Sequence, residues 1–328
     1  MSHLAHHHRR IGVIPRASGA AAAALMARAS AWDASIVETP GCVTLVIWGC
    51  ELRLVAEPDS ARVELLAPDA RLIGNLQDTA TEIFSEAGLE VRWDRVDEGA
   101  LAPGLSLMRV SRIWQRSPGF LRVRLQGPDA SRFGQTALHF RLLLPPSGRT
   151  AVWPRVAASG RTAWPEGADA LHRPVYTVAA QAEDWLEFEI FRHNGSPTCN
   201  WALSDAEGKE VAIVGPGGGW CPAAPALTLF GDETALPAIA RILELAPAVV
   251  LGEVRAFIKA SSEDLGALAH DPHVRRTDDL LNALTETSWP SGGYVWFAGH
   301  APVARAARQQ LLGRGIAKRD FMAAAYWD

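Results

Sequence analysis

The sequence predicts three consecutive folding units: a small α+β unit, an antiparallel β-barrel or sandwich, and an α/β unit with a parallel sheet. The first prediction comes from short β-rich runs around one long helical period before residue 95. The second comes from regularly spaced short strands, separated by Gly and Pro turns, between residues 105 and 216. The third comes from strands that alternate with helices after residue 225. A chain of 328 residues is long enough for two or three such units.

Composition places the chain among ordinary globular proteins, with 48% hydrophobic residues, 21% charged residues and a net charge of −4. The negative charge argues against a bulk electrostatic grip on nucleic acid. No apolar run approaches the roughly 18 residues of a membrane-spanning helix. The four cysteines show no close pairing typical of zinc or redox sites, which predicts buried thiols in a reducing, cytoplasmic compartment. They are Cys42, Cys50, Cys199 and Cys221.

The first section divides into a terminal segment and a small domain. Residues 1–34 combine a histidine-rich start with an alanine-rich stretch, which predicts an unstructured tail followed by a short helix. The histidine cluster is also a possible metal-binding tract. Residues 35–100 are expected to form an α+β domain, and the polar residues 97–104 a linker. Its expected elements are strands at 43–48, 51–55, 61–66 and 89–93, a hairpin turn at Gly49-Cys50, and a helix within 68–88.

The second section, residues 105–222, is expected to be all-β. Residues 145–170 are predicted to form a long loop, and long loops in compact domains are often functional. The glycine-rich segment 215–219 is interpreted as an interdomain hinge, with a phosphate cradle as the alternative. The expected strands are 107–114, 120–126, 138–144, 175–179, 185–191 and 210–214.

The third section, residues 223–328, alternates strands and helices. Thr234 is a candidate cap for the first helix, and Pro237 lies in its first turn. This pattern predicts a parallel sheet whose ligand site lies at the carboxyl ends of the strands. The expected strands are 227–230, 248–254, 294–298 and 321–327, and the expected helices are 231–245 and 301–312.

The common catalytic motifs do not occur in the sequence. No G-x-G-x-x-G follows a strand, and neither a G-x-x-x-x-G-K loop nor a G-x-S-x-G elbow occurs. No metal-ligand spacing occurs beyond the terminal histidines. We therefore predict neither a side-chain nucleophile nor a set of metal ligands.

The informative pattern consists of four segments in a fixed order. Each segment alone has an ordinary structural interpretation: Tyr176-Thr177 suits any strand, Asp232 and Thr234 can cap a helix, and Arg305 is an i,i+3 neighbour of another arginine on an exposed face. The segments are Arg-Pro-Val-Tyr-Thr-Val at 173–178, His-Asn-Gly-Ser-Pro-Thr-Cys-Asn-Trp-Ala at 193–202, Gly-Asp-Glu-Thr-Ala-Leu-Pro-Ala at 231–238, and Trp-Phe-Ala-Gly-His at 296–300 followed by Arg305 and Arg308.

Together and in this order, the segments resemble the siderophore-interacting protein family. Members of that family are FAD-dependent ferric-siderophore reductases. The resemblance implies a ferredoxin-reductase-like fold, with an antiparallel flavin-binding barrel and then an α/β domain for a nicotinamide dinucleotide. It covers about residues 105–328. Residues 35–94 also look like a small domain of unknown function that can precede such reductases.

The resemblance implies specific cofactor contacts. In the family, the first segment binds FAD through an arginine at the pyrophosphate, a tyrosine beside the flavin and a threonine near its reactive edge. The second segment offers backbone N–H groups to the pyrophosphate. The last two border the dinucleotide, and the arginines of the fourth would meet either its phosphates or an anionic substrate. The implied FAD residues are Arg173, Tyr176, Thr177, Val178, His193, Gly195, Thr198, Cys199, Trp201 and Ala202. The implied dinucleotide residues are Asp232, Glu233, Thr234, Ala235, His300, Arg305 and Arg308.

The sequence also departs from the family pattern. Pro174 occupies the position of the family arginine, so Arg173 lies one residue further back. Ala179 replaces a frequent arginine, Cys199 replaces a serine, and His300 replaces a glutamate. These changes are expected to weaken the grip on the FAD pyrophosphate.

The first hypothesis is an NAD(P)H-dependent flavoenzyme that reduces Fe(III) held by a siderophore or another ferric chelate and releases Fe(II). The cofactors would be FAD and either NADH or NADPH, and the flavin, rather than any side chain, would carry the chemistry. A second hypothesis is a flavin-dependent reductase of another acceptor, such as a quinone or free flavin. A third is a non-catalytic protein that binds a siderophore or flavin.

Overall fold

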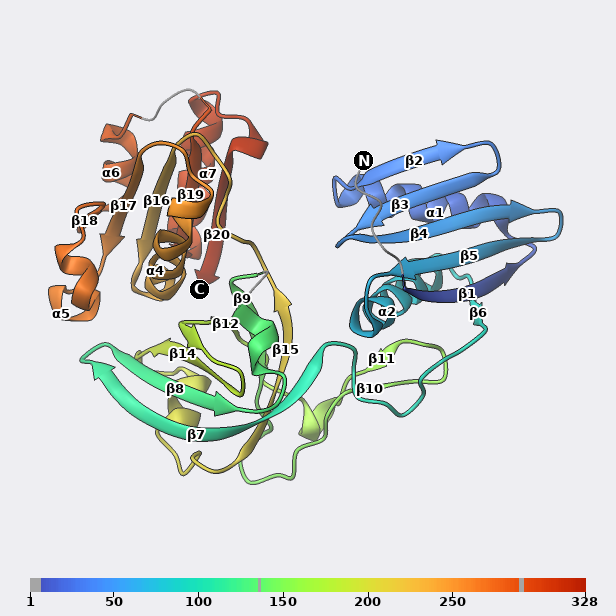
Figure 1. Ribbon diagram of the computed structural model, residues 1–328, viewed down its shortest axis with the longest axis horizontal. Coiled ribbons are helices and arrows are strands. Elements are labelled where there is room, and N and C mark those ends of the chain that lie inside the picture. Colours follow the sequence, from blue (N-terminus) through green and yellow to red (C-terminus); the bar gives the residue numbers. More distant parts are fainter. Residues whose placement is uncertain (1–6, 135–136, 289–291) are drawn as a thin grey trace. The chain divides into compact units, whose positions relative to one another are not determined.

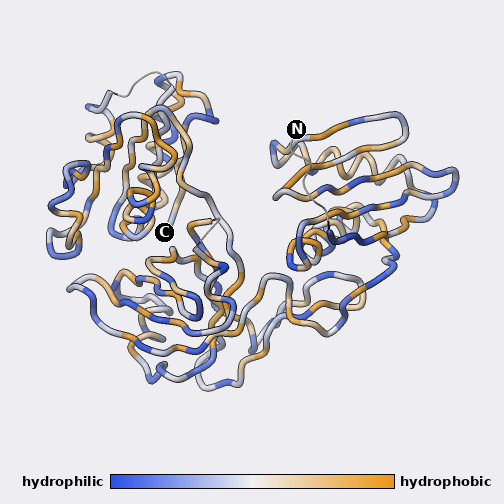
Figure 2. Tube along the Cα trace, viewed as in Figure 1, coloured by the Kyte–Doolittle hydropathy of each residue, from blue (hydrophilic) through white to orange (hydrophobic). Residues whose placement is uncertain are grey.

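The computed structural model describes residues 7–134, 137–288 and 292–328, and it divides into two compact units (Figure 1). One unit contains residues 1–105 together with 148–171, and the other contains 106–147 together with 172–328. Figure 2 shows hydrophobic and hydrophilic segments in both units. No helix among the described residues is long and apolar enough to cross a membrane.

The first unit is an antiparallel sheet with the strand order β2-β3-β4-β5-β1-β6, covered by two helices that contact each other. Alternate strand residues such as Leu52, Leu54 and Val63 share one buried core with Ile73 and Phe84 of the second helix. The strands are β1 (His8–Pro15), β2 (Ser35–Thr39), β3 (Cys42–Ile47), β4 (Cys50–Glu57), β5 (Ser60–Ala67) and β6 (Arg92–Trp93), and the helices are α1 (Ser18–Ala31) and α2 (Ala70–Glu86).

The expected terminal tail is wrong for residues 8–15, which form β1. This strand pairs with β5 on one side and β6 on the other. Its buried alternate residues Gly12 and Ile14 face the core, and Arg10 is only 9% exposed and donates to Asp97 at 2.6 Å. The charged start of the segment hides this short alternation in the sequence. The alanine-rich helix is confirmed as α1, whereas His3 and His6 lie outside the described residues.

The predicted β3–β4 hairpin is confirmed, with its turn one residue earlier than expected. Ile47 pairs with Cys50, so the two-residue loop is Trp48-Gly49. Both loop residues have positive φ, at 53° and 72°, as a type I′ turn requires.

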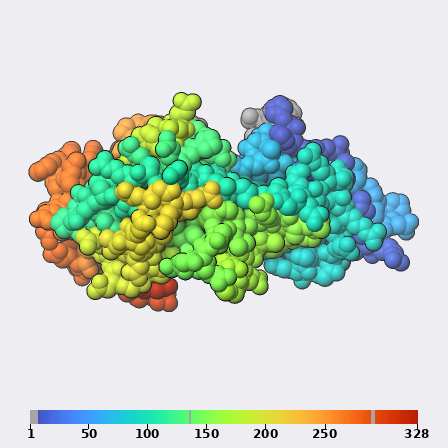
Figure 3. Space-filling view, turned by 90° about the horizontal axis from the view of Figure 1, so that it is seen from below, coloured from blue at the N-terminus to red at the C-terminus, as the bar shows by residue number. Residues whose placement is uncertain are grey.

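Residues 148–171 leave the barrel section and pack with the first unit; we call them the excursion. The Oδ1 and Oδ2 atoms of Asp78 on α2 accept from the N–H and Oγ1 of Thr162 at 3.0 and 2.9 Å, and Arg161 pairs with Glu82 at 3.1 Å. The predicted linker is also paired, because Ala102 N–H donates to the Pro154 carbonyl at 2.9 Å. Figure 3 shows the light-green excursion against the cyan part of this unit. The expected barrel at 105–222 is therefore interrupted. The excursion contains the strands β10 (Arg155–Val156) and β11 (Thr162–Ala163).

The second unit begins with the predicted antiparallel sheet, whose strand order is β12-β9-β15-β7-β8-β14-β13. Its core contains Val123, Phe140, Phe188 and Ile213, which are buried in one cluster. The strands are β7 (Leu105–Ser117), β8 (Phe120–Gln126), β9 (His139–Leu143), β12 (Val175–Thr177), β13 (Ala180–Gln181), β14 (Trp185–Phe191) and β15 (Glu210–Gly217), and one short helix is α3 (Pro197–Ala202).

The unit ends in the predicted parallel sheet, with the strand order β18-β17-β16-β19-β20. The expected closing strand is confirmed at both ends. The strands are β16 (Leu227–Asp232), β17 (Val254–Lys259), β18 (Val274–Arg276), β19 (Tyr294–His300) and β20 (Phe321–Trp327), and the helices are α4 (Leu236–Leu245), α5 (Ser262–Leu265), α6 (Leu280–Glu286) and α7 (Ala301–Gly313).

The expected strand at 248–254 is wrong, because the strand β17 begins only at Val254. Pro247 lies in a 3₁₀ turn, and Leu251 is 95% exposed, so the apolar run does not enter the sheet. In β17, buried Ala256 and Ile258 alternate with more exposed residues. Apolar content alone therefore mislocated the strand.

Candidate functional site

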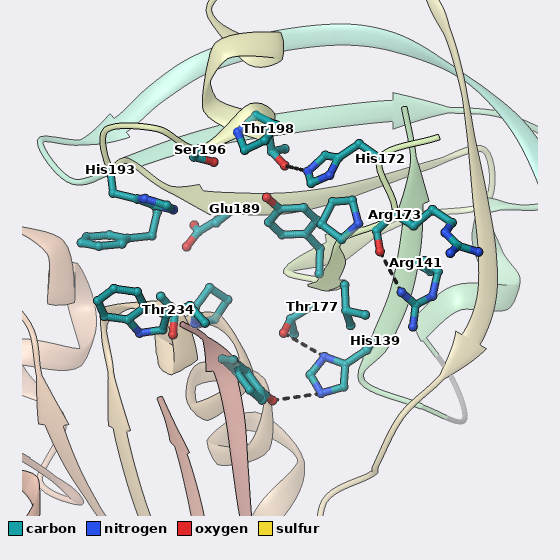
Figure 4. Close-up of a pocket in the computed structure, with 18 of the residues that line it drawn as sticks. His139, Arg141, His172, Arg173, Thr177, Glu189, His193, Ser196, Thr198 and Thr234 are labelled. Carbon is teal, nitrogen blue, oxygen red and sulfur yellow. Dashed lines mark hydrogen bonds between the residues drawn. The ribbon is translucent and has the colours of Figure 1, made fainter. Parts of the chain in front are cut away.

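A cavity of about 790 Å³ lies within the second unit, where barrel strands meet the carboxyl end of the parallel sheet (Figure 4). Strands β9, β12 and β14 and the start of α3 supply the barrel side, and the residues before α4 and the end of β20 supply the other side. The lining residues are Phe120, His139, Arg141, His172, Arg173, Pro174, Val175, Tyr176, Thr177, Glu189, Phe191, His193, Gly195, Ser196, Pro197, Thr198, Thr234, Pro237, Ala325, Tyr326, Trp327 and Asp328.

The structure brings seven of the implied cofactor residues together in this lining. They are Arg173, Tyr176, Thr177, His193, Gly195, Thr198 and Thr234. The others lie outside the lining: Val178, Cys199, Trp201, Ala202, Asp232, Glu233, Ala235, His300, Arg305 and Arg308. Val178 is fully buried in the barrel core because its side chain points to the opposite face of the strand from Thr177.

Tyr176 forms one wall of the cavity. Its ring packs on Phe188 with a centroid distance of 4.8 Å. Burial raises the pKa of Tyr176, so the phenol stays protonated. Thr198 contacts His172, with 2.9 Å between Oγ1 and Nε2. Tyr176, Thr198 and His172 therefore line the same stretch of the cavity.

The start of α3 differs from the expectation at Cys199. Ser196 caps this helix by accepting the Cys199 N–H at 3.2 Å, so that N–H is already satisfied within the protein. The Cys199 thiol donates to the Phe191 carbonyl at 3.4 Å and is buried. Serine-to-cysteine replacement therefore places a small buried side chain against the barrel rather than a hydroxyl in the cavity.

Two arginines lie side by side at one end of the cavity (Figure 4). Arg141 Nη1 donates to the Arg173 carbonyl at 2.7 Å, because Arg141 pairs with Val175 across the β9–β12 ladder. Arg173 was predicted from the sequence, whereas Arg141 was not. Arg141 lies on the same face of β9 as His139, and no local motif marks either residue.

Asp232 occupies the junction of three strand ends in the parallel sheet. Its Oδ1 accepts from the Thr234 N–H at 3.0 Å and the Thr234 hydroxyl at 2.6 Å. Its Oδ2 accepts from the His300 N–H and the Trp327 Nε1–H, both at 2.8 Å. Asp232, rather than Thr234, therefore caps the turn after β16. These four hydrogen bonds occupy the carboxylate with partners inside the protein, and they link the ends of β16, β19 and β20.

The other residues on the dinucleotide side have mixed positions. The His300 ring packs on Trp327 at a centroid distance of 4.5 Å. Arg308 donates to the Ala323 carbonyl at 2.5 Å, which anchors α7 to β20. Arg305 lies on the exposed side of α7. Burial raises the pKa of Glu233.

The polar lining residues that the sequence did not predict also include His139, His172 and Glu189. The Glu189 carboxylate forms an ion pair with Arg116, with 2.8 Å to its Nε, and accepts from Arg122 Nη1 at 3.3 Å, and burial raises its pKa despite both arginines. His172 follows the excursion directly, and burial lowers its pKa. Each is a single polar residue on or beside a strand, so no local motif marks it. The described residues contain no cluster of three metal-ligating side chains.

Known families and proteins match the chain from residue 109 onward. The family model for the siderophore-interacting FAD-binding domain matches residues 109–220, and that for the siderophore-interacting protein matches 224–328. The NADPH-dependent ferric-chelate reductase of Escherichia coli K12 is 26% identical over 68% of this chain and 91% of its own length. The ferric vibriobactin reductase ViuB of Vibrio cholerae is 32% identical over 64% of this chain and 84% of its own.

Solved structures agree with this match. A siderophore utilization protein from T. fusca superposes with a TM-score of 0.59 at 28% identity, covering 71% of this chain and 95% of that one. The siderophore-interacting protein SipS of Aeromonas hydrophila has a TM-score of 0.54 at 23% identity, covering 68% and 91%, and supports the fold alone.

Proposed function

Because the chain belongs to the siderophore-interacting protein family, we propose that it is an FAD-dependent oxidoreductase that uses NAD(P)H to reduce ferric siderophores and release Fe(II). The observation that carries this proposal is the cavity where Tyr176 and Thr177 of the barrel face the end of β20. A cavity between two such layers lets a cofactor contact the barrel while a second ligand approaches from the strand ends.

The residues of the cavity fit FAD. Its volume lies within the roughly 300–1,000 Å³ usual for cofactor sites. The Tyr176 ring offers an aromatic face, and the paired Arg141 and Arg173 offer charge-assisted hydrogen bonds to an anionic pyrophosphate. Arg141 on the neighbouring strand therefore adds a second positive charge beside the displaced Arg173. This second charge offsets the loss of pyrophosphate binding by the family arginine, whose position is Pro174.

Bound FAD would supply hydride acceptance from NAD(P)H and the release of single electrons to iron. The protein's part is to bind and orient. Tyr176 would hold the flavin ring system, Thr177 would offer it a hydroxyl, and the ends of β16 and β19 would hold the dinucleotide. The iron enters as a substrate held by its own chelator.

A purified protein loaded with FAD tests this function. We expect a yellow protein whose flavin is bleached by NADH or NADPH under anaerobic conditions. Addition of a ferric siderophore should then restore the flavin absorbance and give two Fe(II) per NAD(P)H, measured with a ferrous chelator. Faster turnover with quinones or free flavin than with any ferric chelate would favour the second hypothesis. A colourless protein that takes up no FAD would contradict the proposal.

We also infer that the protein works in the cytoplasm. All four cysteines are free thiols, and Cys50, Cys199 and Cys221 are buried. Unpaired thiols in a chain of this size are typical of a reducing compartment. Fractionation of cells that produce the natural protein, with a cytoplasmic and a periplasmic marker, tests this location.

A further inference from the structure

His139 bridges two hydroxyl groups at the wall of the cavity (Figure 4). Its Nδ1 lies 3.1 Å from Thr177 Oγ1, and its Nε2 lies 3.2 Å from the Tyr326 hydroxyl. Thr177 belongs to the barrel and Tyr326 to the last strand of the parallel sheet. All three residues line the cavity.

The imidazole is held in one orientation by its surroundings. His139 and Thr177 are directly opposite on the antiparallel β9–β12 ladder, so their side chains share one face. On the other side, Gly218 leaves room for the ring, because a Cβ at that position would lie 2.5 Å from His139 Cδ2. Tyr326 meets the ring edge-on, at a centroid distance of 5.9 Å and an angle of 83°. The glycine-rich segment thus makes space for a histidine.

The protonation of His139 determines the direction of the hydrogen bonds to Thr177 and Tyr326. Burial lowers the pKa of His139 to about 4, so the ring is neutral at pH 7 and carries a single N–H. One ring nitrogen therefore donates and the other accepts. A phenol is more acidic than an aliphatic alcohol and is the better donor of the two hydroxyls. Tyr326 should therefore donate to Nε2, which leaves Nδ1–H to donate to Thr177 Oγ1.

We propose that His139 is a positioning residue, anchored by Tyr326, that turns the Thr177 hydroxyl hydrogen into the cavity and so favours the oxidised form of the bound cofactor. The inference rests on the proposed function, because the cofactor is taken to be FAD. The oxidised isoalloxazine edge presents four acceptors and one N–H, and reduction adds an N–H at a ring nitrogen. A fixed donor therefore matches the oxidised edge better than the reduced edge.

The substitution Tyr326→Phe tests this proposal with the ring retained. Without the phenol donor, His139 is free to take the Nε2–H tautomer. Thr177 can then donate its hydroxyl hydrogen to His139 Nδ1 and present an acceptor to the cavity. We expect the ratio of affinities for reduced over oxidised FAD to rise about two- to tenfold, the range of one neutral hydrogen bond. A tenfold rise corresponds to an increase of about 30 mV in the midpoint potential of this two-electron couple, measured by spectroelectrochemistry.

Two further variants separate orientation from packing. Thr177→Val removes the donor and should raise the potential in the same direction. Tyr294→Phe, which removes a hydroxyl from the same sheet away from the cavity lining, should leave it unchanged. A merely structural role for Tyr326 would weaken oxidised and reduced FAD binding alike. An unchanged or lowered potential in Tyr326→Phe therefore overturns the proposal.

A measurement without FAD tests the same orientation. In protein with ¹⁵N-labelled histidine, the resonance that changes in Tyr326→Phe identifies His139, and its shift should be that of the Nδ1–H tautomer. The Nε2–H tautomer would overturn the inference even if the protein reduces ferric chelates. If the wild-type protein binds no FAD at all, the proposed function fails, and the inference about the cofactor fails with it.

Discussion

Trp327 donates its indole N–H to the Asp232 carboxylate at 2.8 Å, which joins the next-to-last residue of the chain to the end of the first strand of the parallel sheet. The same carboxylate accepts the His300 N–H and both donors of Thr234. A single side chain therefore closes three strand ends beside the cavity.

Substitution Asp232→Ala should destabilise the protein because it leaves several donors without an acceptor. Each buried donor left unsatisfied costs about 1–3 kcal/mol, so we expect a loss of at least that size in the free energy of unfolding. Urea denaturation followed by tryptophan fluorescence measures it. The control is Asp205→Ala, whose side chain is 96% exposed and pairs only weakly with Lys209, at 3.7 Å. Equal stability of the two variants would contradict the role of Asp232.

Removal of the Tyr176 ring should loosen FAD. A stacked aromatic contributes about 0.5–1.5 kcal/mol beyond the area it buries, so Tyr176→Ala should weaken FAD binding by at least several-fold. Tyr176→Phe keeps the ring against Phe188 and loses only the hydroxyl, so its effect should be smaller. Titration of apoprotein with FAD, followed by flavin fluorescence, gives both affinities. An unchanged affinity in Tyr176→Ala would place the flavin elsewhere.

The free energy of unfolding should depend on pH through His139. Its pKa falls from 6.5 in the unfolded chain to about 4 in the folded protein, so below pH 6.5 the unfolded chain binds the extra proton first. This term removes stability as pH falls from 6.5 to 4, by at most about 1.4 kcal/mol per pH unit. Urea denaturation at pH 7, 5.5 and 4.5 should therefore show a shallower loss in His139→Gln than in wild type. Parallel pH profiles would show that burial of His139 does not contribute.

The variants Gly218→Ala and Gly219→Ala form a matched pair. Gly218 has a φ of 77°, and an added Cβ would collide with His139, whereas a Cβ on Gly219 meets nothing within 4 Å. The positive φ alone costs a non-glycine residue about 1–2 kcal/mol. We expect Gly218→Ala to lower the melting temperature and weaken FAD binding, and Gly219→Ala to change neither. Similar behaviour of both would contradict the glycine's part in seating His139.

Periodicity predicted most of the second unit because its strands follow simple rules. The strands at 120–126, 185–191 and 321–327 have the predicted bounds, since each has apolar residues that enter one core and clear turn signals at both ends. The prediction of the strand β17 was wrong because a longer apolar run precedes it and stays outside the sheet. The strand β1 was not predicted because charged residues at its start conceal the alternation that buries Gly12 and Ile14.

The candidate site was predictable only where a contiguous segment carries it. Tyr176, Thr177 and Thr198 lie in recognisable segments and line the cavity. His139 and Glu189 come from separate strands, and their part depends on which strands become neighbours. Asp232 lies in a predicted segment, but its use by His300 and Trp327 follows from the strand order β16-β19-β20. Local sequence therefore indicates residues, whereas topology decides which of them meet.

The excursion places a segment of the first unit inside the barrel sequence of the second. The chain leaves the barrel after Leu144 and returns at His172, and these two residues pair with each other. Between them, Thr162 and Arg161 are bound by Asp78 and Glu82 of the first unit. A truncation that removes residues 1–105 would strip this segment of its partners immediately before His172 of the cavity. The N-terminal domain is thus interleaved with the barrel along the chain, so a chain shortened in this way would keep the excursion without the Asp78 and Glu82 carboxylates that bind it.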